Sequence, residues 1–483
     1  MTGASLPNAG LIEHLRFRGL LFQCTDESAL GAHLASADVG AGGRRVYCGF
    51  DPTADSLTVG NLVPIMGLRH FQQAGHTPVV VMGGGTGLIG DPSGKSAERQ
   101  LLSDETVAAN VKSQRRIFEA LLDFSPGRPN RAIILNNADW LRGISYLEVL
   151  RTVGKHMSVN ELIKRDSVRD RLSREQGLSY TEFSYAILQA MDFLLLYHKA
   201  GVTVQMGGSD QWGNIIAGLN LIRHEAALQF QGARQMPGFV GFADGSGFYT
   251  GRAAAAVQNA AAEVQHAGAT FGLTFPLVTK SDGGKFGKSE SGAVWLTPER
   301  TSPFSFYQFW LNTSDADVAR FLRTFTLMPP AEILELERSH AADPSRREAH
   351  RALARHMTTM LHGEAAMQQA ESSTGALFST GGEDQDFAQM DPAMLRQLFA
   401  TAPATEHPRG MLAGDGMSLV DLLAQTSLAR SKREAREHLA AGAIAVNGRK
   451  VGPDDRLTLA DLLHDEVALI RRGKKNWHVT RWC

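Results

Sequence analysis

The chain has 483 residues, with 49 Lys and Arg against 50 Asp and Glu, and 43% of its residues are hydrophobic. This composition predicts a soluble protein of two or three domains and excludes intrinsic disorder and collagen. The apolar stretch near Phe193 to Tyr197 is far shorter than the roughly 20 residues that cross a bilayer, so we expect no membrane partner. Cys24, Cys48 and Cys483 are too scattered for a disulfide framework, and no secretory signal precedes them. We therefore expect a reduced, cytoplasmic compartment.

Charge is unevenly distributed along the chain. Residues 428–483 contain 12 Lys and Arg against 7 Asp and Glu, a balance of +5, whereas the rest of the chain carries −6. A basic end on an acidic body predicts an attachment surface for a polyanion.

The first half of the chain alternates short β-rich runs with helical periodicity, which predicts an α/β fold with a doubly wound parallel sheet. The expected strands are residues 45–50, 77–82, 131–135 and 202–206. The expected helices are about 60–74, 104–122, 144–175 and 180–199. Ligands of such sheets bind outside the carboxyl ends of the strands, so the loops there are the candidate site.

The second half divides into further parts, after a first domain over residues 1–300. Residues 301–375 show helical periodicity only, and residues 376–415, rich in Gly, Pro, Asp and Thr, are typical of a linker. Residues 416–483 form a small α+β module, in which a helix at 431–441 gives way to a strand and turn. Residues 226–268, with 12 Ala, 7 Gly and four charges, are interpreted as an insertion, part loop and part helix.

A glycine-rich loop, Gly83 to Ser96, follows the strand that ends near Met82 and favours nucleotide binding, because glycine lets a phosphate or ribose approach the backbone. Its spacing fits the dinucleotide fingerprint, but Asp91-Pro92 would break the helix that this motif opens. A P-loop would need glycine at Ile89. Six glycines in fourteen residues also disfavour a merely structural turn.

Two other segments are candidates for binding phosphate. In Tyr47 to Asn61 a strand meets the turn Asp51-Pro52, and a helix start near Gly60 offers free N–H groups to an anion. A polar turn explains this segment equally well. Lys285-Phe-Gly-Lys-Ser289 places two lysines around a glycine, as a mobile clamp for polyphosphate or as a solvated basic loop.

A polar stripe interrupts the apolar helix at 180–199. Tyr185, Gln189 and Asp192 follow each other at i, i+4 and i+7 and so share one helix face. Burying a carboxylate and an amide without partners is costly, so the stripe predicts either a polar ligand or a hydrogen-bonded network. Gly207 to Gln211, at a strand end, adds another polar rim.

Several motifs in order resemble one family. They are Tyr47 to Asn61, Gly83 to Ser96, Thr181 to Tyr185, Gln205 to Gly213, Lys285 to Ser289 and Arg471 to Lys475. Together they resemble the bacterial-type tyrosyl-tRNA synthetases, class I aminoacyl-tRNA synthetases with a Rossmann-like catalytic domain, an α-helical anticodon-side domain and a C-terminal S4-type RNA-binding domain. Tryptophanyl-tRNA synthetases share the fold but lack this set of tyrosine, glutamine and aspartate.

The resemblance implies that the chain activates L-tyrosine with ATP, which brings Mg²⁺, and transfers the tyrosyl group from the adenylate to tRNA(Tyr). The residues implied for tyrosine binding are Tyr47, Asp91, Tyr185, Gln189, Asp192 and Gln211. Those implied for ATP are Gly49, Asp51, Thr53, Gly60, Asn61, Asp210, Lys285 and Lys288. The catalytic set is Lys285, Lys288, Thr53, Thr58 and Asn61, which would act by positioning and charge stabilisation.

The resemblance also implies a homodimer and RNA contacts in the basic end. The residues implied for RNA are Lys432, Arg433, Arg436, Arg471, Arg472, Lys474 and Lys475. Such contacts to phosphate position RNA and weaken with salt. No H-E-x-x-H motif is present, so we expect no protein metal site.

The sequence departs from the family pattern at its His-x-Gly-His signature, where it has Thr58-Val-Gly60-Asn61. Asn61 still offers a donor, but Thr58 is shorter than histidine and carries no charge. A catalytically weakened synthetase-like RNA-binding protein is therefore the alternative function. A NAD-binding or P-loop enzyme is a more distant one.

Overall fold

The computed structural model divides the chain into two compact units. The first comprises Met1–Lys288, Ala293–Arg300 and Thr313–Leu353, and the second Ser289–Gly292, Thr301–Asn312 and Ala354–Cys483. The structure describes residues 10–483 apart from 93–100, 165–167, 170–171, 173–176, 235–238, 242–246, 250, 282, 284–285, 290–291, 379–386, 390–391, 393–394, 397–398, 400–401 and 474–475. None of the helices in these ranges has both the length and the apolar character needed to cross a bilayer.

A six-stranded sheet forms the centre of the first unit, with the order β1-β8-β5-β2-β3-β4. The strands are β1 (Gln23–Cys24), β2 (Arg45–Phe50), β3 (Thr77–Met82), β4 (Ile133–Asn136), β5 (Val202–Gly208) and β8 (Phe271–Phe275). Pairing is parallel except at the edge, where β1 runs antiparallel to β8. All six residues of β3 are buried, as expected for a central strand covered on both faces. The doubly wound α/β prediction is confirmed, although β1 and β8 were not expected.

Helices connect these strands and cover the sheet. They are α1 (Leu11–Phe17), α2 (Glu27–Ala35), α3 (Leu62–Gln73), α4 (Asp104–Leu121), α9 (Tyr180–Ala200) and α10 (Trp212–Arg234). Ser103 and Ser179 accept backbone hydrogen bonds as the N-caps of α4 and α9, which is why both helices start where the sequence predicts. The expected helix at 144–175 is wrong for residues 144–164. Short helices α6 (Tyr146–Thr152) and α7 (Val159–Ile163) lie there, because Gly154 opens a 3-10 turn and Ser158 begins a new helix. Most of residues 165–175 lie outside the described residues.

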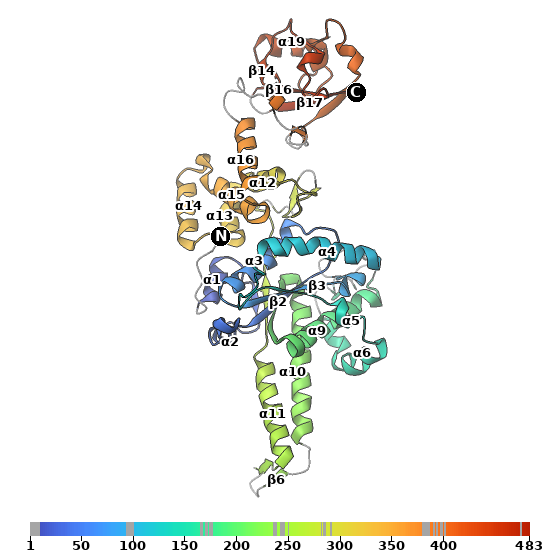
Figure 1. Cartoon of the computed structure of the whole chain (residues 1–483), viewed down its shortest axis with the longest axis vertical. Helices are drawn as coiled ribbons and strands as arrows, with labels where there is room; N and C mark the ends of the chain where they lie inside the picture. The colour runs from blue at the N-terminus through green and yellow to red at the C-terminus, as the bar shows by residue number, and fades with distance from the viewer. Residues whose placement is uncertain are drawn as a thin grey trace. The chain divides into compact units, whose positions relative to one another are not determined.

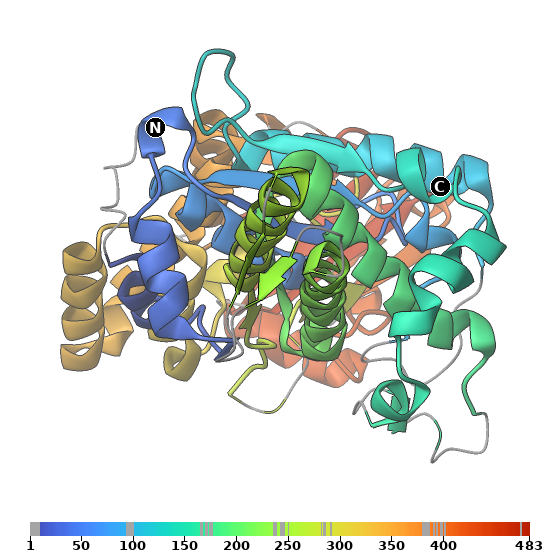
Figure 2. The same ribbon diagram turned by 90° about the horizontal axis from the view of Figure 1, so that it is seen from below.

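The expected insertion at 226–268 continues α10 and returns as α11 (Gly251–Gly268), with the short pair β6 (Phe239–Gly241) and β7 (Gly247–Tyr249) between them. Figure 1 shows α10 and α11 side by side as a long hairpin, and Figure 2 shows the same two helices nearly end-on. The alanine-rich sequence at 253–262 lies in α11, as its helix propensity predicts.

Residues 301–378 are all described and contain helices and no strand, as predicted. The helices are α12 (Pro303–Leu311), α13 (Asp315–Phe325), α14 (Pro330–Ala342), α15 (Glu348–His362) and α16 (Glu364–Phe378). Helices α13 and α14 belong to the first unit, and α12 and α16 to the second.

The C-terminal part of the second unit is a five-stranded sheet with the order β11-β17-β16-β13-β14. Its strands are β11 (Ala404–His407), β13 (Ile444–Val446), β14 (Arg449–Lys450), β16 (Val467–Arg472) and β17 (Asn476–Trp482), and α18 (Leu419–Leu423) and α19 (Lys432–Ala440) accompany them (Figure 1). Asn447 and Gly448, both with positive φ, make the predicted turn between β13 and β14. Strand β11 pairs with β17 and lies in the expected linker, while the domain boundaries themselves stay a prediction.

Candidate active site

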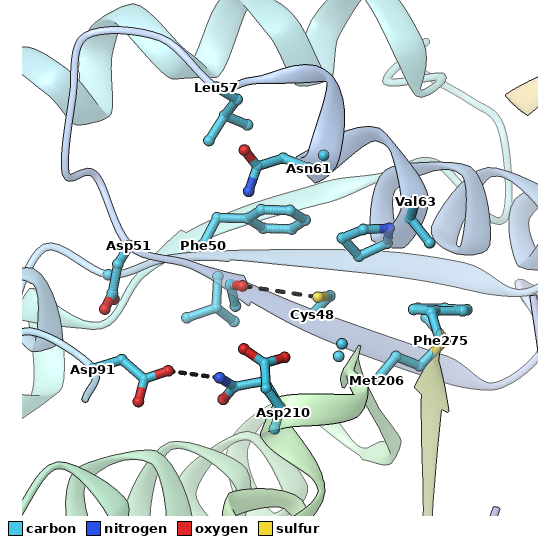
Figure 3. A pocket seen from close by; sticks show the side chains of 18 of the residues that line it. Cys48, Phe50, Asp51, Leu57, Asn61, Val63, Asp91, Met206, Asp210 and Phe275 are labelled. Atoms are coloured by element: carbon cyan, nitrogen blue, oxygen red, sulfur yellow. Dashed lines mark hydrogen bonds between the residues drawn. The ribbon is translucent and has the colours of Figure 1, made fainter. Parts of the chain in front are cut away.

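A cavity of about 550 Å³ opens at the carboxyl ends of β2, β3 and β5, in the first unit (Figure 3). Its lining includes thirteen of the residues singled out in the sequence: Tyr47, Gly49, Asp51, Thr53, Thr58, Gly60, Asn61, Asp91, Tyr185, Gln189, Asp192, Asp210 and Gln211. Lys285 lies outside the described residues. Lys288 begins β9 (Lys288–Ser289). The sheet topology therefore brings one set of loops together, as the doubly wound prediction requires.

Two buried side chains, Tyr47 of β2 and Asp192 of α9, line this cavity, and the charge of Asp192 acts on the Tyr47 phenol. The Tyr47 hydroxyl has no hydrogen-bond partner although the side chain is fully buried. Its pKa lies well above the usual value, first because of burial and then because of the negative charge of Asp192. A buried, unpartnered hydroxyl at a cavity wall is a group that a ligand can satisfy.

Asp192 accepts hydrogen bonds from two side chains that the sequence did not predict as part of the site. Asn137 Nδ2 donates to Asp192 Oδ2 at 2.9 Å, and Trp140 Nε1 donates to Oδ1 at 2.7 Å. Burial raises the pKa of Asp192 to about 7, although both hydrogen bonds act in the opposite direction. The available signal was Asn136-Asn137, a polar pair at the carboxyl end of β4.

A chain of hydrogen bonds joins Asn137 to the polar stripe through the glycine loop. Asn137 Nδ2 donates to Thr86 Oγ1 at 3.0 Å, and Thr86 donates to Asp51 Oδ1 at 2.8 Å. Tyr185 donates its hydroxyl proton to the other oxygen of Asp51 at 3.0 Å. Asp51 thus links a residue expected at tyrosine to the segment expected at ATP. Tyr185 and Asp192 of the stripe therefore take part in a hydrogen-bonded network, one of the two alternatives that the sequence left open, and a ligand at the stripe stays a prediction.

Gln189, on the same face of α9, has a buried side-chain oxygen with no hydrogen-bond partner. Opposite it, Gln211 Nε2 donates to Asp91 Oδ2 at 2.6 Å, and Asn214 donates to Gln211 Oε1 at 3.2 Å. Figure 3 shows Asp91 and Asp210 on the same side of β2, and Asn61 on the other side of the strand. The cavity therefore has an acceptor-rich side and a side lined by a helix start.

Thr58 and Asn61 form that helix start together. The Thr58 N–H and hydroxyl both donate to Asn61 Oδ1, at 3.0 and 3.1 Å. Because a backbone N–H can only donate, this contact fixes the amide orientation and leaves the Asn61 NH₂ group as a donor. Trp295 forms a β-bridge with Thr58, which ties the turn to residues 293–297.

Glycines near the cavity serve two purposes: some allow close packing of neighbouring side chains, and others leave space in the cavity for a ligand. A Cβ on Gly83 would collide with the Asp51 carboxylate and the Thr86 hydroxyl. Gly49 is different, since a Cβ there would meet nothing nearer than the Val81 carbonyl oxygen at 4.0 Å, and Gly49 lines the cavity. A glycine at position 49 thus leaves the cavity wide beside β2.

The basic residues expected to bind RNA differ in how many contacts they already make within the protein. Arg433 and Arg436 are exposed on α19. Arg433 makes an exposed ion pair with Glu437 at 3.0 Å, and Lys432 makes one with Asp421 at 2.8 Å. Arg472 donates to the Leu428 carbonyl at 2.7 Å, so part of its guanidinium supports the fold of the module. Arg471 lies over the Trp477 ring, 5.3 Å from its centroid. Lys474 and Lys475 fall outside the described residues.

Two family profiles match the chain. The profile described as "tRNA synthetases class I (W and Y)" matches residues 42–379, and the one described as "Tyrosine--tRNA ligase SYY-like C-terminal domain" matches residues 395–480.

Full-length relatives carry the corresponding name. A tyrosine–tRNA ligase of Roseiflexus castenholzii is 44% identical over 472 residues, covering 98% of this chain and 99% of the relative. One of Dechloromonas aromatica is 43% identical over 474 residues, with 98% and 99% covered. A crystal structure of a C-terminally truncated mitochondrial tyrosyl-tRNA synthetase of Aspergillus nidulans is 28% identical, with a TM-score of 0.62, and covers 76% of this chain and 94% of that one.

These relatives favour a ligase over the synthetase-like RNA-binding alternative, since both profiles and both ends of the chain are matched. Each motif that carried the resemblance lies within the matched ranges. The chain therefore belongs to the tyrosine–tRNA ligase family of the class I tRNA synthetases.

Proposed function

We propose that this chain is a tyrosine–tRNA ligase, which activates L-tyrosine with ATP and transfers the tyrosyl group to the 3′ end of tRNA(Tyr). The observation that carries the proposal is the pair of Tyr47 and Asp192 in the wall of the cavity. A substrate phenol between them would accept a hydrogen bond from Tyr47 and donate its own to Asp192. Phenylalanine in the same place would leave both groups unpaired, and the general principle of such selection is illustrated by this family.

The amino group of tyrosine needs acceptors, and the cavity supplies them nearby. Gln189 offers its unpartnered oxygen, and Asp91 and Tyr185 line the same cavity. Asp91 already accepts a hydrogen bond from Gln211, which fixes the Asp91 carboxylate. Gln211 lines the same cavity and would lie near the substrate carboxylate. An ammonium group against Asp91 would gain a charge-assisted hydrogen bond.

ATP would occupy the wider part of the cavity beside Gly49. Asp210 would bind the ribose, and Asp51, Thr53 and Gly60 would line the adenylate region. The Asn61 NH₂ group, with Lys285 and Lys288, would stabilise the charge that develops on the phosphates. No side chain needs to act as nucleophile, because the tyrosine carboxylate attacks the α-phosphate and pyrophosphate leaves. Mg²⁺ accompanies ATP as part of that substrate, and we assign no residue to it.

Tyrosine-dependent exchange of pyrophosphate into ATP tests this proposal. Purified, folded protein should exchange with tyrosine and show almost no exchange with phenylalanine. Asp192→Ala should raise the KM for tyrosine far more than the KM for ATP. Absence of tyrosine-dependent exchange, or an Asp192→Ala variant that still selects tyrosine, would overturn the assignment.

Binding of tRNA is proposed to use the C-terminal module, with Lys432, Arg433 and Arg436 on α19 as phosphate contacts. Their exposure supports this role. A chain that lacks residues 416–483 should keep pyrophosphate exchange and lose most of its tRNA charging. Equal loss of both activities would contradict a separate RNA-binding role. A cytoplasmic location is part of the proposal, because charged tRNA is consumed by protein synthesis.

A homodimer is also proposed, and an apolar surface in the first unit supports it. Large hydrophobic side chains are exposed around α6, α7 and the start of α9: Tyr146, Leu147, Leu150, Val159, Ile163, Leu172 and Tyr180. Leu147 is 76% exposed. Exposed apolar patches of this kind are typical of association surfaces. Leu147→Glu should shift the mass measured by light scattering from dimer to monomer, whereas Leu228→Glu, at an exposed leucine of α10, should not.

A further inference from the structure

Three potential metal ligands meet in the helical part of the first unit, away from the cavity. Asp315 opens α13, His340 lies in the last turn of α14, and His350 lies in the first turn of α15. One ligand atom from each of the three lies within 4.8 Å of the other two. None of these residues lines the active-site cavity.

The distances suit a small divalent ion. His350 Nε2 lies 3.3 Å from Asp315 Oδ1, and His340 Nε2 lies 3.9 Å from the same oxygen. In a tetrahedral zinc site with bonds of about 2.0–2.1 Å, ligand atoms stand roughly 3.3–3.4 Å apart. His340 Nε2 also lies 3.2 Å from the Asp315 backbone carbonyl oxygen, and metal binding would replace this contact by rotation of the side chain. Asp315 is 61% exposed, so a water molecule could complete the coordination from solvent.

His350 is the observation that points to a ligand. Its side chain is fully buried, yet neither ring nitrogen makes a hydrogen bond of normal geometry. An imidazole nitrogen that carries no proton and has no hydrogen-bond partner offers the lone pair that a metal needs. The edge-to-face contact with His340, with ring centroids 5.3 Å apart, does not satisfy these nitrogens.

We propose that Asp315, His340 and His350 form a structural site for a divalent transition metal, with Zn²⁺ as the expected ion. The bound metal would cross-link the start of α13, the end of α14 and the start of α15. Two imidazoles and a carboxylate suit Zn²⁺, whereas Mg²⁺ and Ca²⁺ prefer oxygen ligands alone. The proposal is independent of the tyrosine and ATP assignments.

The place of the site gives it a second consequence. Asp317, two residues after Asp315, accepts hydrogen bonds from the backbone N–H and the hydroxyl of Ser281, both at 3.0 Å. Ser281 precedes Lys285 by four residues in the sequence. A metal at the start of α13 would therefore stabilise the helix to which Ser281 is hydrogen-bonded.

The test uses the full-length chain without a histidine tag, stripped of metal with a chelator. One equivalent of Co²⁺ should give the strong visible absorption of a tetrahedral site, Zn²⁺ should displace it, and Zn²⁺ but not Mg²⁺ should raise Tm. Asp315→Asn and His340→Gln should each weaken Zn²⁺ binding by at least about tenfold, the scale of a ligand-sphere defect. Asp315 is exposed, so its variant should fold even where His350→Gln does not.

A matched control is His198→Gln, which removes the histidine of an exposed pair with Glu225 at 2.8 Å. It should bind Zn²⁺ as the unchanged chain does. The proposal is overturned if stoichiometric Co²⁺ gives no tetrahedral spectrum. It is equally overturned if Asp315→Asn and His340→Gln bind Zn²⁺ like the unchanged chain, or if the control alone loses binding.

Discussion

Replacing Tyr47 with phenylalanine separates tyrosine selection from stability. The change removes one oxygen atom from a side chain that is 2% exposed and leaves its ring contact with Phe193, at 5.4 Å between centroids, in place. In the ligand-free protein the lost hydroxyl has no partner. Tyr47→Phe should therefore leave the free energy of unfolding unchanged or raise it, because an unsatisfied buried hydroxyl costs about 1–3 kcal/mol.

The expected loss of activity follows from the one hydrogen bond to the substrate phenol. A hydrogen bond between neutral groups contributes about 0.5–1.5 kcal/mol net, which corresponds to about 2- to 12-fold in kcat/KM for tyrosine. The kcat/KM for phenylalanine should stay constant or rise, since phenylalanine no longer leaves Tyr47 unpaired. The tyrosine-to-phenylalanine ratio should therefore fall by at least the loss seen with tyrosine.

The assay is pyrophosphate exchange with each amino acid, together with urea unfolding of the same preparations. Tyr197→Phe is the matched control, since the Tyr197 hydroxyl donates to Glu263 at 2.7 Å and lies outside the cavity. It should lower stability by about 1 kcal/mol and leave selection unchanged. An unchanged selectivity ratio in Tyr47→Phe would refute the pocket assignment, and a stability loss equal to the control's would refute the unpartnered hydroxyl.

Three other predictions concern the cavity and the C-terminal module. Burial raises the pKa of Asp192 to about 7, and the substrate phenol must donate its hydrogen bond to the ionised carboxylate. The kcat/KM for tyrosine should therefore rise with pH up to about 7 and then level off. Asp192→Asn should lack this rise when kcat/KM is measured across the pH range. Trp140→Phe removes a charge-assisted hydrogen bond worth about 1.5–3 kcal/mol and should raise the KM for tyrosine while the KM for ATP stays within twofold. Arg433→Gln with Arg436→Gln should weaken tRNA binding and reduce its salt dependence by about 0.7–0.9 per lost contact, with exchange unaffected; an unchanged salt slope in filter binding would exclude both residues as phosphate contacts.

The sequence was sufficient where one local pattern determined the structure. Strands β2 and β3 have the predicted bounds, because compact apolar runs end at Asp51 and at Gly83. Strand β8 was missed, since five residues after an alanine-rich helix carry too little signal of their own, and its burial comes from pairing with β5. The apolar periodicity across 144–175 did not reveal the breaks at Gly154 and Ser158.

The candidate site likewise contains residues that a local sequence pattern predicts and residues that only the folded structure brings together. Tyr185, Gln189 and Asp192 could be grouped from helix periodicity alone, because they share one face of α9. Asn137 and Trp140 could not, since they are more than fifty residues away and reach Asp192 only through the position of β4 at the sheet edge. The parallel register of β3 and β4 pairs Met82 with Asn136 and so places Asn137 and Trp140 beside the cavity end of the sheet.

Thr58 shows how the structure changes the meaning of a residue that the sequence marked only as a departure. Its N–H and hydroxyl both hold Asn61 Oδ1, so Thr58 is a positioning residue for Asn61. A histidine-like cationic role is then absent at position 58, and the neutral NH₂ of Asn61 is the donor that this turn can direct at a phosphate. A neutral donor stabilises developing charge less than a cation does. The proposed mechanism therefore places more of the charge stabilisation on Lys285 and Lys288. Thr58→Val keeps the N–H contact, so it should slow pyrophosphate exchange less than Asn61→Ala does. Lys288→Ala should slow exchange more than either variant. The reverse order would show that Thr58 itself takes part in catalysis.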